Sequence, residues 1–102
     1  MGVYARTNFE VTCDTHDTAK KVLKVLEERT KEGDANGNTF GRDLQIEDNQ
    51  VFGEEDSPRV QNLEYRTQEM WEAIKDIKGV QELNAPFLLE GDGMYFSNED
   101  NE

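Results

Sequence analysis

The chain has 102 residues and a formal net charge of −12 at pH 7, with 23 acidic residues against 11 Lys and Arg. This length suits one domain with a modest core, and no apolar run approaches the roughly 18 residues that span a bilayer. Phosphates and anionic membrane surfaces attract basic segments, so the charge argues against direct binding of nucleic acid or of a membrane.

Residues 3–13, VYARTNFEVTC, alternate between an apolar side and a mainly polar side. Side chains that repeat with period two, rich in β-branched and aromatic residues, indicate a half-buried strand. Because the second side is polar, we expect a sheet that is covered on one face only.

Cys13 is the only cysteine and His16 the only histidine. A lone thiol in a strand pattern favours a reducing compartment, and the chain shows no signal-peptide core. We therefore expect a cytoplasmic protein. If a phage encodes it, the compartment is the cytoplasm of the host. We expect Cys13 to be a small buried core residue rather than a reactive thiol. Two further ligands at zinc-like spacing are missing, so we expect no metal and no cofactor.

Residues 14–33, DTHDTAKKVLKVLEERTKEG, carry apolar side chains at the spacing of one helical stripe. They predict a helix that Gly33 closes. The stretch DANGN at 34–38 predicts a loop. Its oxygen-bearing side chains suggest a calcium loop, but Thr39 replaces the required glycine and Gln45 the bidentate glutamate, so we expect no calcium site.

Two strands are predicted next, one within TFGRDLQIED (39–48) and one in RVQNLEYR (59–66). In the second, Leu63 and Tyr65 lie on one face. EEDSP, residues 54–58, lies between the two, and its proline suits the start of a strand, where no hydrogen bond of the ladder is lost. This region therefore predicts a β-hairpin with a long acidic loop.

Residues 67–79, TQEMWEAIKDIKG, predict a second helix with Thr67 as its N-cap. Trp71 falls on the apolar side of this helix, and we expect it in the core. The segment up to residue 96 predicts one long strand, two short strands or a tight hairpin around GDG. Residues 97–102 then predict a disordered acidic tail.

The predicted order is strand, helix, strand, strand, helix, strand. It is the β-α-β-β-α-β split unit of the ferredoxin-like arrangement, an antiparallel sheet with two helices on one face. This agrees with the one-sided alternation of residues 3–13. We expect a single α+β domain over residues 1–96, and the fold by itself implies no function.

No sequence motif in the chain identifies an enzymatic reaction. A Gly-x-Ser-x-Gly elbow and both glycine-rich phosphate motifs are absent. A catalytic acid–base pair needs two carboxyl groups whose different environments separate their pKa values, and the sequence alone identifies no such pair. We expect a protein that is not an enzyme. RNA-binding modules share the predicted topology, but the third predicted strand lacks their aromatic and glycine signature and the charge has the wrong sign.

The negative charge belongs to one part of the chain. Residues 1–33 carry six acids and six bases, whereas residues 34–102 carry 17 acids and five bases. Carboxylates can occupy a basic groove in place of phosphates, and a field of one sign accelerates encounter. We therefore expect an acidic protein that binds a basic, nucleic-acid-binding protein and blocks it. Phage and plasmid inhibitors of host defence, such as anti-CRISPR proteins, are the analogy in size and charge.

The candidate partner-binding residues lie in three acidic segments: Asp43, Glu47 and Asp48; Glu54, Glu55 and Asp56; Glu90 and Asp92. For each single acid, a solvated surface without a partner is the competing interpretation. The alternative function is a homodimeric regulatory or small-ligand-binding module of the same fold. Its contacts would come from exposed aromatic residues, for which Phe52, Phe87 and Tyr95 are the candidates.

Overall fold

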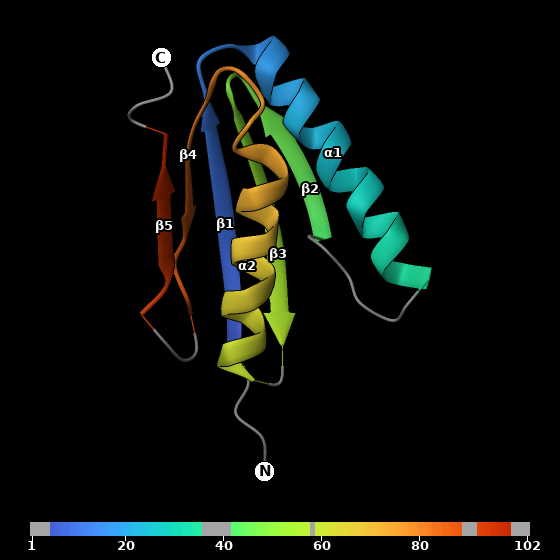
Figure 1. The fold of residues 1–102 in the computed structure, drawn as a ribbon, viewed down its shortest axis with the longest axis vertical. Helices are drawn as coiled ribbons and strands as arrows, with labels where there is room; N and C mark the ends of the chain where they lie inside the picture. Colours follow the sequence, from blue (N-terminus) through green and yellow to red (C-terminus); the bar gives the residue numbers. More distant parts are fainter. Residues whose placement is uncertain (1–4, 36–41, 58, 89–91, 99–102) are drawn as a thin grey trace.

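The computed structural model describes residues 5–35, 42–57, 59–88 and 92–98 of the chain. Its elements are β1 (Ala5–Cys13), α1 (His16–Ala35), β2 (Arg42–Glu47), β3 (Gln50–Ser57), α2 (Val60–Ile74), β4 (Val80–Ala85) and β5 (Met94–Ser97). The strands form one antiparallel sheet in the order β2-β3-β1-β4-β5. Both helices lie on the same side of this sheet (Figure 1). The predicted α+β class is confirmed, and the described sheet has five strands, because the C-terminal segment forms two short strands, one of the alternatives that the sequence left open.

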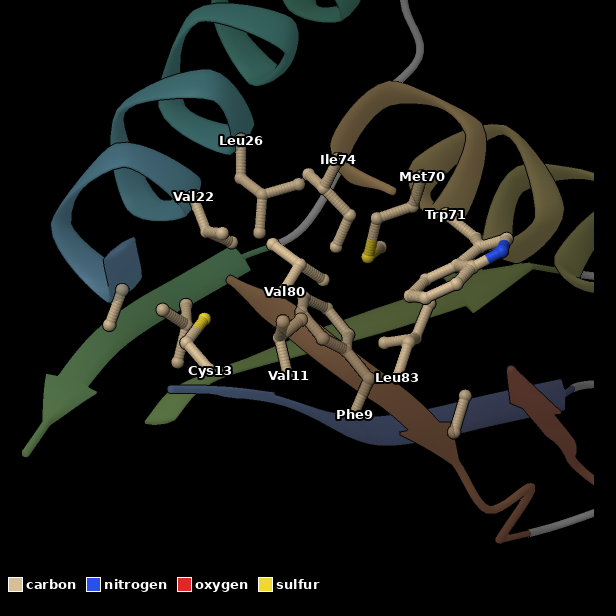
Figure 2. Close-up of a cluster of buried hydrophobic side chains, with 13 residues drawn as sticks. Phe9, Val11, Cys13, Val22, Leu26, Met70, Trp71, Ile74, Val80 and Leu83 are labelled. Atoms are coloured by element: carbon tan, nitrogen blue, oxygen red, sulfur yellow. The ribbon is translucent and has the colours of Figure 1, made fainter. Parts of the chain in front are cut away.

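The core is a layer of apolar side chains between the helices and the sheet (Figure 2). It includes Phe9, Val11 and Cys13 from β1, Val22 and Leu26 from α1, Met70, Trp71 and Ile74 from α2, and Val80 and Leu83 from β4. Trp71 is 7% exposed and stacks on Phe96 of β5, with ring centroids 5.5 Å apart. The prediction that Trp71 belongs to the core is therefore confirmed.

The prediction of strand β1 and of helix α1 is confirmed over most of their length. In β1 every second residue from Ala5 to Cys13 is buried, as the alternation of the sequence requires. The N–H of Thr18 donates to the Thr15 hydroxyl oxygen at 3.2 Å at the start of α1, which makes Thr15 the N-cap. The helix continues two residues beyond Gly33, and residues 36–38 of the expected loop lie outside the described residues.

The turn between β2 and β3 lies at Asp48 and Asn49, where Glu47 pairs with Gln50. Asp48 has a left-handed backbone conformation with φ 52°, which suits a two-residue turn between antiparallel strands. The expectation that EEDSP forms the hairpin loop is wrong, because residues 54–57 continue strand β3. Every second residue from Val51 onward is buried there, so the acidic run belongs to a half-buried strand.

The predicted strand over residues 59–66 is also wrong, because the chain forms helix α2 from Val60. The buried residues of this helix are Leu63, Thr67, Met70, Trp71 and Ile74. Their separations of three and four are typical of a helix, and Tyr65 is 66% exposed. Thr67 is not the N-cap, since it lies inside α2 and its hydroxyl donates to the Leu63 carbonyl oxygen at 2.7 Å.

The C-terminal part contains two short strands rather than one long one, and β5 pairs with β4 along its whole length. The segment expected as a tail from residue 97 begins inside the fold. Ser97 belongs to β5, and the Asn98 side-chain amide donates to the Lys75 and Val80 carbonyl oxygens. Residues 99–102 lie outside the described residues. Among the described helices, none combines the length and the hydrophobicity that a bilayer crossing requires.

Cys13 provides a first test of this core. Burial raises the pKa of the Cys13 thiol to about 11, and the neighbouring Asp14 charge adds to the effect. The thiol therefore stays protonated at pH 8, where little reactive thiolate is present. We expect Ellman's reagent to react far more slowly with the native protein than with the urea-unfolded protein at this pH. Equal rates would contradict the burial of Cys13.

A pair of substitutions tests helix α2 directly. A strand would bury Leu63 and Tyr65 together, whereas the helix buries Leu63 completely and exposes Tyr65. We expect Leu63→Ala to lower the free energy of unfolding by about 3 kcal/mol. Tyr65→Ala is the matched control, with an expected change below about 0.5 kcal/mol. Urea unfolding followed by circular dichroism measures both values, and comparable losses would contradict the helix.

Candidate functional site

None of the described helices covers the second face of the sheet (Figure 1). Its side chains come from the alternate strand residues that do not enter the core, and opposite partners on neighbouring strands share a face. One cross-strand row contains Gln45, Phe52, Glu10, Asn84 and Tyr95, from β2 to β5. The next row contains Glu47, Gln50, Thr12, Glu82 and Ser97. We call this surface the open face, and it also includes Arg6, Asn8, Glu54 and Asp56 farther along β1 and β3.

Negative charge dominates the open face. Its acids are Glu10, Glu47, Glu54, Asp56 and Glu82, which outnumber its cations: Arg6 lies on β1, and the register places Arg42 of β2 opposite Glu54. Arg6 forms an ion pair with Glu54, and the Tyr95 hydroxyl donates to Glu82 Oε2 at 2.5 Å. The helix layer differs, because α1 exposes both basic and acidic side chains. The molecule therefore has a mixed-charge side and an acidic side.

The open face contains a depression with a volume of about 420 Å³. It lies over β1, β2 and β3, and its lining residues are Asn8, Phe9, Glu10, Asp43, Gln45, Phe52, Gly53 and Glu54. Asp43 has φ 52° and lies at an irregularity in the pairing of β2 with β3. Phe9 belongs to the core and is 1% exposed, so the aromatic ring on the open face of this depression is that of Phe52. The carboxylates and side-chain amides around it accept hydrogen bonds and favour a cation.

Most of the described acids that the sequence nominated reach solvent. Glu54 and Asp56 lie on the open face two residues apart, so both side chains point the same way. Asp43, Glu47 and Asp48 are exposed on β2 and its turn. Of the third acidic segment, Asp92 is exposed just before β5, and Glu90 lies outside the described residues. The structure therefore brings together the first two acidic segments.

Glu55 differs from the other nominated acids, because it points to the helix side and is only 1% exposed. Arg66 of α2 lies beside it, with Arg66 Nη1 3.8 Å from Glu55 Oε2. The same nitrogen donates to the Asp56 carbonyl oxygen at 3.2 Å, so Arg66 links α2 to the end of β3. Glu55 has a structural place in the fold, and a partner at the surface cannot reach it.

Two open-face acids were not nominated from the sequence, namely Glu10 on β1 and Glu82 on β4. Both are isolated acids in alternating strands, whereas the nominated residues came from dense acidic segments. The polar side of the first strand already contained Glu10, so alternation could have identified it. Of the aromatic candidates, Phe52 and Tyr95 lie on the open face, while Phe87 packs against the core.

The function must be argued from this geometry, because comparison with known proteins provides no relative. No protein-family model, no curated protein and no solved structure matches the chain. Within the described residues, no three His, Cys, Asp or Glu side chains are grouped so that they could hold a metal ion. The open face, with its acids and its depression, is the candidate site.

The neighbouring residues Glu54 and Glu55 test which acids are structural. We expect Glu55→Ala to lower the free energy of unfolding by about 3 kcal/mol, because it leaves a cavity where a fully buried side chain packs beside the partly exposed Arg66. Glu54 has a side chain that is 23% exposed and pairs with the 42% exposed Arg6, so Glu54→Ala should cost less than about 1 kcal/mol. Urea unfolding of both variants measures the difference. Equal costs would contradict the assignment of these residues to opposite faces.

Proposed function

We propose that this protein is a non-enzymatic acidic binding protein that occupies and blocks the basic groove of a nucleic-acid-binding protein. The observation that carries this proposal is the acidic open face, where strands β1, β2, β3 and β4 each contribute a carboxylate and the acids outnumber the two cations, Arg6 and Arg42. An excess of negative charge on one face attracts a positive groove to that face, while the mixed charges of the helix side give no such excess. An inhibitor of host defence encoded by a phage or plasmid is the biological class that we propose.

Electrostatics explains how such a face would act. A basic groove that binds phosphates also attracts carboxylates, so the two compete for the same Lys and Arg side chains. Complementary potentials mainly raise the association rate and make it depend on salt. A sheet holds its carboxylates on a hydrogen-bonded backbone, which reduces the entropy lost on binding. The open face therefore suits a competitor of nucleic acid better than flexible acidic loops would.

We further propose that the fold is a ferredoxin-like split unit with an added fifth strand. The sequence of elements from β1 to β4 and the sheet order β2-β3-β1-β4 support this assignment. In RNA-binding modules of that topology, the uncovered sheet face carries aromatic side chains on which bases stack. The same face in this protein carries carboxylates around Phe52 and Tyr95. It would therefore bind a protein that itself binds nucleic acid, and not the nucleic acid.

A second candidate function is a homodimeric regulatory or ligand-binding module. The observation in its favour is that Tyr95 is 60% exposed and lies in the same cross-strand row as Phe52. Aromatic residues on an uncovered face can pair two copies of a chain. Sedimentation velocity separates the two proposals, because a dimer that forms through this face would hide the acids from a basic partner.

Affinity capture from a nuclease-treated bacterial lysate tests the proposed function. The variants differ only in where three charges are removed. The open-face variant is Glu10→Gln, Glu47→Gln and Asp56→Asn, and the helix-side control is Glu27→Gln, Glu28→Gln and Glu69→Gln, all exposed on α1 or α2. We expect the wild-type protein and the control to retain a basic, nucleic-acid-binding protein at 50 mM NaCl, and the open-face variant to lose most of it.

Salt and competition complete this test. The retained protein should dissociate at 500 mM NaCl and be displaced by added duplex DNA or RNA, because both treatments weaken contacts to its phosphate-binding groove. Mass spectrometry identifies the retained proteins. The proposal is wrong if the retained proteins are not basic, or if the two triple variants lose them equally.

A further inference from the structure

The depression in the open face has a chemistry more specific than negative charge alone. Its aromatic wall is Phe52, which lies between Gln45 on β2 and Glu10 on β1 in one cross-strand row. In the adjacent row, Asn8 lies opposite Glu54. An aromatic ring is therefore surrounded by carboxylate and amide oxygens, and no described residue of the lining carries a positive charge.

We propose that this depression receives an arginine side chain of the basic partner, an inference that rests on the function proposed above. A guanidinium is planar, stacks on an aromatic ring and presents five N–H donors in a fixed fork. Phe52 would contact its flat side, and the Glu10 carboxylate would accept two of its N–H groups from the central strand. The oxygens of Asn8 and Gln45 are further acceptors at the rim.

The chemistry of the lining favours arginine over the other basic side chain. Lysine presents three donors on a compact, strongly hydrated ammonium, which can approach a ring only as a point charge, has no flat side to stack on it and forms no bidentate pair with one carboxylate. The open face already shows the preferred contact within the molecule, since the Arg6 guanidinium forms an ion pair with Glu54.

Two capped peptides test the inference without knowledge of the partner. The probe is Gly-Gly-Arg-Arg-Gly-Gly and its matched control is Gly-Gly-Lys-Lys-Gly-Gly, each titrated into the ¹⁵N-labelled full chain at 50 mM NaCl and followed by NMR. We expect the arginine peptide to bind at least about threefold more tightly, because it alone stacks on Phe52. The largest chemical-shift changes should fall on residues 8, 10, 45 and 52.

Variants of the same face separate a specific pocket from a diffuse field. Glu10→Gln should weaken the arginine peptide about tenfold, since it removes a charged hydrogen-bond acceptor. Glu47→Gln is the matched control, because Glu47 lies on the same face and outside the depression, and it should change the affinity less than about twofold. Phe52→Leu keeps an apolar side chain and should reduce the preference for arginine to near one. Thermal unfolding of each variant checks that the fold is retained.

Each other result overturns the inference in a recognisable way. If both peptides bind equally and the Glu10 and Glu47 variants weaken them equally, the arginine site is wrong while the acidic face of the proposed function stands. If neither peptide binds, the arginine site is also wrong, and the capture experiment decides the proposed function separately. If the protein alone sediments as a dimer that Phe52→Leu dissociates, a second copy of the chain occupies the depression instead.

Discussion

The position of the Phe9 ring over Gly53 determines which side chains of this protein meet solvent. Phe9 and Gly53 are opposite partners on β1 and β3, and a Cβ on Gly53 would lie 2.5 Å from Phe9 Cζ and 2.8 Å from Leu44 Cδ2. A glycine is therefore needed where the ring crosses the neighbouring strand. If the register slipped by one residue, Glu54 and its even-numbered neighbours would turn into the core. Packing of an apolar ring thus sets the charge of the opposite surface.

The same strand explains where prediction from the sequence succeeded and where it failed. β1 and α1 have one clear period each, so their residues could be assigned with no knowledge of the fold. In β3, three consecutive acids follow Gly53, and such a run is typical of a loop. The strand exists because Glu55 can be buried beside Arg66 of α2, a contact that joins two elements and has no local signal. Leu63 fits period two with Tyr65 and helical spacing with Thr67 and Met70, so the local pattern did not decide between a strand and α2.

The candidate site was predictable in part for a related reason. Density of acids along the chain identified Glu54 and Asp56 but also included Glu55, which is buried. Alternation along each strand would have separated these residues, and it would have added Glu10 from the first strand. The grouping of strands into one surface, with Glu82 beside β1, depends on the sheet order. Charge density therefore indicates that a surface is acidic, whereas strand register indicates which acids compose it.

The two edges of the sheet restrict how another molecule can approach. β2 has an irregular pairing near Asp43 and exposed charges at Asp43 and Glu47, and β5 has only four residues. Twisted, charged or short edge strands prevent the sheet from continuing into a strand of another chain. The two edges thus protect a sheet that no described helix covers on its second face from polymerising through its backbone hydrogen bonds.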